Sequence, residues 1–166
     1  MKAILLPPVP ALLSAYSGRT DPVAELRSAC RQAAAWLGAA RVLCDPVDEA
    51  ARQRGVRVPL GVRIVESLGI EIDPTSDDLV VVASGSAMRT EKAPGHFDPR
   101  AEQFDAAIDA AIRTGQGFDQ IDHLLGDLLL AQGLRGLASL PDRSRVQVDY
   151  ADAPYGVTYW VARFET

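Results

Sequence analysis

The residues whose side chains could do chemistry are concentrated in one stretch, residues 84–98, which is rich in Gly, Pro and charge. Arg, Glu, Lys, His and Asp side chains all occur there within ten residues, from Arg89 to Asp98. Groups of these types can transfer protons or bind an anionic ligand. A solvated surface loop has the same composition, so that interpretation stays open beside the functional one.

The candidate ligand-binding residues come from this stretch and from the turn-forming residues 153–156. Arg89 and Lys92 are the side chains suited to an anionic group. The alternatives are a plain surface position for Arg89, a surface ion pair between Glu91 and Lys92, and a helix-capping role for Asp98. The full set of candidates is Ser86, Arg89, Glu91, Lys92, His96 and Tyr155.

A second group of ligand-type side chains, Asp119, His123 and Asp127, has a spacing of four residues. On one helix these residues would share a face, and two carboxylates around an imidazole could hold a metal ion. A solvated helix face opposite an apolar stripe has the same pattern, and we prefer that interpretation.

The counts of histidine and cysteine exclude several classes of site. The 166 residues contain two His and two Cys, Cys30 and Cys44, which excludes a zinc ribbon, a disulfide scaffold and a site built mainly on imidazole and thiolate. We interpret the cysteines as buried, reduced thiols. The sequence also lacks the glycine-rich phosphate-binding motifs and the Gly-x-Ser-x-Gly motif of hydrolases.

The charge and the N-terminal residues bear on location and partners. A net charge of −5 and a pI near 5.0 argue against general binding to nucleic acid or anionic membranes. The apolar residues 3–13 superficially resemble a signal peptide, but Pro7, Pro8 and Pro10 would break its helix. We therefore expect a cytoplasmic protein without nucleic-acid or membrane partners, and a homo-oligomer stays an open alternative.

These residues need elements to position them, and the sequence alternates predicted strands with predicted helices, as is typical of an α/β domain. The unbroken β-branched run 79–83 predicts a central parallel strand buried on both faces. With no linker or repeat, we expect residues 1–166 to form a single domain. The other predicted strands are 2–6, 41–44, 146–150 and 157–164.

Helix starts are predicted from three Asp-Pro pairs, at residues 21–22, 45–46 and 98–99. Asp is a favoured N-cap residue, and Pro is favoured at the first helical position. The first of these helices ends at Gly38, the second at Gly55 and the third at Arg113. Further helices are predicted over residues 60–68, 118–131 and 134–140.

Three separated segments also carry a resemblance to a known family. They are residues 84–113, with Ser84-Gly85-Ser86-Ala87 and Glu91-Lys92-Ala93-Pro94-Gly95-His96-Phe97-Asp98, residues 146–164, with Asp149-Tyr150-Ala151-Asp152-Ala153-Pro154-Tyr155-Gly156, and, more weakly, residues 1–15. In this order they resemble the class III extradiol ring-cleavage dioxygenase-like family, in particular its small actinobacterial members. The resemblance implies an α/β fold with a central, mostly parallel sheet flanked by helices, shortened over residues 40–78.

Active members of that family hold a non-haem Fe(II) with two His and a carboxylate, and use a further His as acid–base group. The resemblance thus implies at least three imidazoles, whereas this chain has two. Pro8-Val9-Pro10 is similar to the family's opening Pro-His-Pro, so Val9 stands in place of a ligand. The base His falls at about Ala87 or Met88, the second ligand His lies in the shortened region, and His96 inherits no role.

We therefore expect a dioxygenase-like fold without the Fe(II) site and without a cofactor. Such a protein would bind a small molecule or a partner protein, using the crevice beside residues 84–98. One alternative is a metal-dependent ring-cleavage dioxygenase that holds Fe(II) with substitute ligands. Another is a purely structural role in an oligomer.

Overall fold

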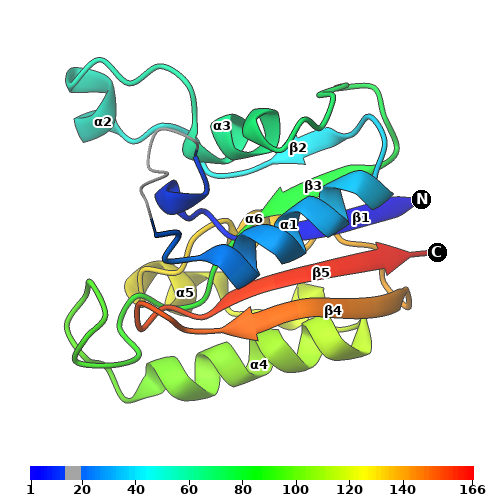
Figure 1. Cartoon of the computed structure of the whole chain (residues 1–166). Coiled ribbons are helices and arrows are strands. Elements are labelled where there is room, and N and C mark those ends of the chain that lie inside the picture. Colours follow the sequence, from blue (N-terminus) through cyan, green and yellow to red (C-terminus); the bar gives the residue numbers. More distant parts are fainter. Residues whose placement is uncertain (14–19) are drawn as a thin grey trace.

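The computed structural model describes residues 1–13 and 20–166 of the chain (Figure 1). Residues 14 and 15, at the end of the N-terminal segment of the resemblance, lie outside the described residues. Five strands form one mixed sheet in the order β2-β3-β1-β5-β4. They are β1 (Lys2–Leu6), β2 (Arg41–Leu43), β3 (Leu79–Val82), β4 (Arg145–Asp152) and β5 (Tyr159–Glu165).

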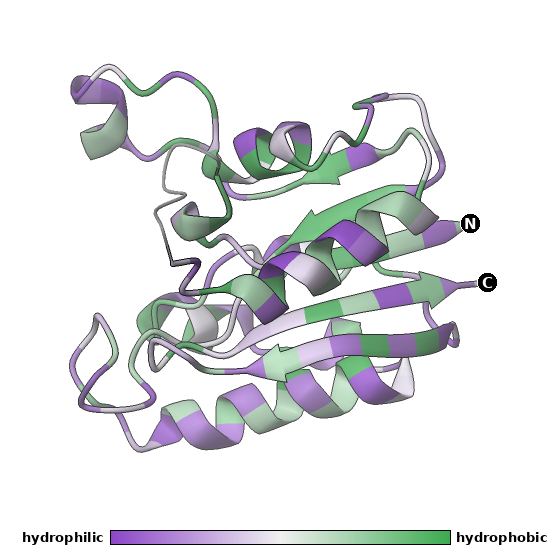
Figure 2. Ribbon diagram, viewed as in Figure 1, coloured by the Kyte–Doolittle hydropathy of each residue, from purple (hydrophilic) through white to green (hydrophobic). Residues whose placement is uncertain are grey.

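The expected α/β class is confirmed, and the sheet combines two kinds of pairing. β1, β2 and β3 are parallel, whereas β5 runs antiparallel to β1, and β4 antiparallel to β5. The run that predicted a central parallel strand is β3, which pairs with a parallel neighbour on each side and is buried at all four residues. Figure 2 shows β2 and β3 as mainly hydrophobic, while hydrophobic and hydrophilic residues alternate along β4.

Helices cover both faces of the sheet and create two apolar cores. Along β1, Ile4 and Leu6 face the core formed with α1 (Ala24–Trp36) and α3 (Leu60–Ser67), because successive strand residues point to opposite faces. Ala3 and Leu5 face the other core. That second core is covered by α4 (Arg100–Thr114), η3 (Phe118–Gln120), α5 (His123–Leu128) and α6 (Leu134–Leu137).

The predicted start of the second helix was wrong. Helix α2 (Glu49–Gln53) begins after Asp48, whose carboxylate accepts a hydrogen bond from the Ala51 N–H at 2.7 Å. The Asp45 carboxylate instead accepts the Gly133 N–H at 2.7 Å, so it is used by a segment 88 residues away. A long-range partner of this kind has no signal in the local sequence.

The predicted helix over residues 118–131 is divided into two pieces. Phe118–Gln120 is a 3-10 turn, and α5 begins only at His123 because the Asp122 carboxylate accepts the Leu125 N–H at 3.0 Å and caps a new helix. At the third Asp-Pro pair the helix begins one residue later than expected: Pro99 is the N-cap of α4, and Asp98, just before it, accepts the Arg100 N–H at 2.9 Å. No helix in residues 1–13 and 20–166 has both the length and the apolar character needed to cross a bilayer.

Candidate functional site

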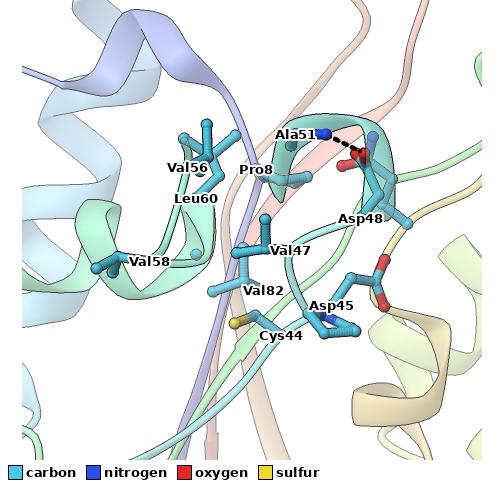
Figure 3. A pocket seen from close by; sticks show the side chains of 13 residues that line it. Pro8, Cys44, Asp45, Val47, Asp48, Ala51, Val56, Val58, Leu60 and Val82 are labelled. Carbon is cyan, nitrogen blue, oxygen red and sulfur yellow. Dashed lines mark hydrogen bonds between the residues drawn. The ribbon is translucent and has the colours of Figure 1, made fainter. Parts of the chain in front are cut away.

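A cavity of about 350 Å³ lies where the three parallel strands end (Figure 3). Each of these strands contributes a residue to its wall: Pro8 follows β1, Cys44 follows β2, and Val82 is the last residue of β3. Ligands in open α/β sheets bind beyond the carboxyl ends of the strands, and the volume is within the range of small-molecule pockets. We refer to this space as the carboxyl-end cavity.

Most of the remaining wall of the cavity is apolar and comes from residues 45–61, and Gln132 also lines it. Figure 3 shows Val47 between Val82 and Pro8, with α2 above them. Gly61, at the start of α3, allows the helix to approach Cys44, because a Cβ on Gly61 would lie only 2.5 Å from the Cys44 Cβ. The apolar lining residues of this segment are Val47, Ala51, Val56, Val58 and Leu60.

Both carboxylates that line the cavity are already engaged by backbone N–H groups. Asp48 accepts the Ala51 N–H at the start of α2, and Asp45 accepts the Gly133 N–H. Among residues 1–13 and 20–166, none of those that line the cavity is Lys, Arg or His. The cavity therefore offers apolar surface to a ligand, and its charge disfavours an anionic one.

Of the lining residues in the described part of the chain, Cys44 is the one with a nucleophilic side chain. Burial raises the pKa of its thiol, partly offset by a hydrogen bond from the Val62 N–H, and the nearby Asp45 raises it further. Cys30 is completely buried, and burial raises the pKa of that thiol to about 12. Both cysteines are free thiols, as expected, but the expected burial holds for Cys30 alone, because Cys44 is half-buried and lines the cavity.

Ser86, a predicted ligand-binding residue, is fully buried and orients the backbone of its loop. Its hydroxyl donates to the Leu129 carbonyl at 2.7 Å and accepts the Met88 N–H at 2.9 Å. Its own N–H donates to the Asp105 carboxylate at 2.8 Å. These bonds fix the first turn of the 84–98 stretch against α4 and the segment that follows α5.

Arg89 is half-buried and belongs to a chain of hydrogen bonds. Its guanidinium donates to the Thr158 hydroxyl at 2.8 Å, and that hydroxyl donates to the buried Asp105 carboxylate at 2.6 Å. Burial raises the pKa of Asp105, although its hydrogen bonds from Ser86 and Thr158 and the positive charge of Arg89 oppose the shift. Arg89 and Asp105 line an open hollow of about 590 Å³ between α4 and the 151–158 segment.

Three further predicted residues, Glu91, Lys92 and Tyr155, line a separate surface hollow together with the 153–156 turn. The turn closes against the loop, since a Cβ on Gly156 would lie 2.6 Å from the Thr90 hydroxyl. Within the described chain, neither Glu91 nor Lys92 forms an ion pair. His96 is exposed and lies in neither hollow.

Asp119, His123 and Asp127 do not form the shared helix face that both interpretations of their spacing assumed, the preferred solvated face and the alternative metal site. Asp119 belongs to the 3-10 turn and His123 to α5, so the three residues do not lie along one helix. In the parts of the chain that the structure describes, no group of three or more His, Cys, Asp or Glu side chains could hold a metal ion.

The side chains at the positions where the resemblance implies a ligand His (Val9) and the base His (Ala87 or Met88) do not fit an iron site. Val9 is buried in the core that contains α1, with 2% of its surface exposed. Ala87 packs against the same core and Met88 against the other one. Apolar side chains cannot replace the imidazoles of a two-His, one-carboxylate site, so we derive no step through iron.

No protein-family model and no curated protein sequence matches the chain.

Three residues with a role in the cavity or the hydrogen-bond network were not selected by the sequence interpretation: Cys44, Val47 and Asp105. A general rule could have pointed to Cys44, because it follows the second predicted strand and the carboxyl ends of parallel strands share one edge. Nothing local marks Asp105, whose partners are 19 and 53 residues away in the chain.

Proposed function

We propose that this chain is a small-molecule-binding protein with a fold that resembles the class III extradiol dioxygenase-like family but without its Fe(II) site. The observation that carries this proposal is the carboxyl-end cavity, to which all three parallel strands contribute through Pro8, Cys44 and Val82. A cavity at that place in an α/β sheet is the usual ligand site of the architecture.

The lining indicates the class of ligand. Apolar side chains dominate the wall that the structure describes, the two carboxylates carry negative charge, and none of the described lining side chains is basic. A neutral, compact molecule with a single ring fits this environment better than an aromatic acid, whose carboxylate would lose hydration without gaining a cationic partner. Catechol represents the first class and benzoate the second.

Calorimetric titration under argon tests this proposal, with catechol and benzoate as separate probes. We expect catechol to bind the chain and benzoate to bind at least about tenfold more weakly, a difference of about 1.4 kcal/mol. The substitution Val47→Trp fills the cavity and should abolish catechol binding. Leu124→Trp, at an exposed position on α5, is the matched control and should leave binding unchanged.

An assay with iron separates binding from catalysis. After anaerobic addition of Fe(II), the chain should retain no stoichiometric iron and should not open the catechol ring when O₂ is admitted. Stoichiometric iron with turnover would contradict the proposal and support a dioxygenase with substitute ligands. Loss of catechol binding in Leu124→Trp, or its persistence in Val47→Trp, would place the ligand elsewhere.

A further inference from the structure

The outer edge of β4 is an eight-residue strand with no strand beside it, because β4 ends the sheet order. Apart from its ladder with β5, no backbone group of residues 145–152 takes part in a hydrogen bond with the described residues. An unpaired edge of this length is a template for pairing with another strand unless the protein protects it. The opposite edge, β2, has only three residues.

A β-bulge in β4 changes which face of the sheet the residues after it point to. The register of β4 against β5 shifts between Val148 and Tyr150. Before the shift, Val146 and Val148 face the α4 core, so Arg145 and Gln147 face the α1 side. After the shift, Tyr150 packs against the α1 core and Asp152 lies opposite Tyr159 of that core. Arg145 and Asp152 therefore share one face that a regular strand would not give them.

We propose that β4 pairs with β4 of a second copy of this chain in antiparallel orientation, which joins two sheets into one. In one register, Arg145 lies opposite Asp152 of the second copy, and Gln147 lies opposite Tyr150 of the second copy. Val146 then faces Ala151 of the second copy, and the two bulges meet. Every one of these pairs has both side chains on the same face, as cross-strand pairing requires.

The charges of Arg145 and Asp152 favour a second copy of this chain in antiparallel orientation as the partner. Arg145 is exposed and forms no ion pair with the described residues. From the residues that the structure describes, the exposed Asp152 carboxylate accepts one hydrogen bond, from the N–H of the next residue, Ala153. In the proposed dimer a two-fold axis relates the two copies, so the Arg145–Asp152 pair forms twice. Opposite charges directly across two strands are stabilising. A parallel, in-register arrangement of the same edges would instead place like charges beside each other, which disfavours it.

Sedimentation velocity over a range of concentrations tests the dimer. We expect reversible self-association that weakens as salt is raised. Asp152→Arg places like charges opposite each other twice, and should weaken association at least about tenfold. Arg145→Asp should do the same, and the double exchange Arg145→Asp with Asp152→Arg should restore association to within about threefold of the original.

Glu66→Arg is the matched control, because it makes the same kind of charge change at an exposed position on α3. It should leave association unchanged, and thermal unfolding of each variant should show that the fold is intact. A monomer at every concentration would overturn the proposal. So would a dimer indifferent to the single exchanges, or one that the double exchange fails to restore. The proposal does not depend on ligand binding in the carboxyl-end cavity.

Discussion

At the scale of single residues, two carboxylates on α4, Asp105 and Asp109, have pKa values shifted in opposite directions by their surroundings. Asp105 is buried and holds the Ser86 N–H and the Thr158 hydroxyl, and burial raises its pKa. One turn further, burial alone would raise the pKa of Asp109, but hydrogen bonds from Arg113 and Trp160 outweigh it and the pKa is lowered. Burial therefore determines the direction of the pKa shift at Asp105, and hydrogen bonding determines it at Asp109.

The substitutions Asp105→Asn and Asp109→Asn should have opposite pH dependences. A raised carboxyl pKa contributes stability that is complete below the unfolded value of 3.8 and is lost as pH rises through the folded pKa. A lowered pKa contributes stability above 3.8 that is lost as the pH falls. As measured by urea unfolding, wild type should thus gain stability relative to Asp105→Asn as the pH falls from 7 to 4. Relative to Asp109→Asn it should lose stability only at lower pH, between about pH 4 and pH 2.

The control for this comparison is the double variant, whose difference from wild type should equal the sum of the two single differences at each pH. If both single variants changed in the same direction with pH, the assignment of the two environments would be wrong.

The cysteines differ in a way that reagents can detect. A methanethiosulfonate reagent should modify Cys44 in the native protein and spare Cys30, because Cys44 lines the cavity and Cys30 is buried. Since the thiol pKa of Cys44 is raised above 9.0, the rate should still increase with pH at that value. Mass spectrometry follows the reaction. Cys44→Ser should remove all native labelling, and rapid labelling of Cys30 would contradict the packing of α1.

At the scale of elements, the connections are where the sequence-based expectations and the structure differ most. The buried strand β3 was predictable because its unbroken β-branched run needs no partner to be recognised. The division of residues 118–131 was not, since an apolar stripe continues through Ile121 and Leu125 across the break. Asp122 ends the pattern by capping α5, and the segment contains several Asp residues that could have had that role.

The cavity was harder to predict than the strands that build it. Its wall includes Gln132, which is far from Cys44 in the chain, and the contact depends on how the chain returns from α5 to the sheet. The loop at 84–98 was selected by its composition, yet its Ser86 and Arg89 are bound to other parts of the protein. Composition marks charged side chains, whereas an apolar cavity has no compositional signal.

A substitution at Gly133 can test how closely the segment after α5 packs against the end of β3. Its φ is +70°, and a Cβ there would lie 1.9 Å from the Val82 carbonyl oxygen, at the end of β3. Gly133→Ala should therefore lower the free energy of unfolding by about 3 kcal/mol or more. Gly69→Ala is the control, because Gly69 has a φ of +75° but open space around its Cβ position, and it should cost only about 1–2 kcal/mol.

Equal effects of the two substitutions in denaturant unfolding would show that backbone conformation alone, and not the contact with β3, determines the cost. A small effect at both positions would mean that the segment after α5 can move away from the sheet.

At the scale of the whole molecule, one end of the sheet brings together the cavity, the charged loop and exposed apolar side chains. Figure 1 shows α2, α5 and the 84–98 loop at the end toward which β3 points. Leu124 and Leu128 of α5 are exposed, with 79% and 66% of their surfaces accessible. The long free edge of β4 runs along the side of the molecule, so ligand binding and self-association would use different surfaces.

Protection of Cys44 tests the binding function most directly, because the thiol lines the carboxyl-end cavity itself. The measurement is the rate of native methanethiosulfonate modification under argon, with and without saturating catechol. We predict at least about fivefold slower modification of Cys44 with catechol, weaker protection by benzoate at the same concentration, and no protection in Val47→Trp. An unchanged rate at saturating catechol would contradict the proposal that this cavity is the ligand site.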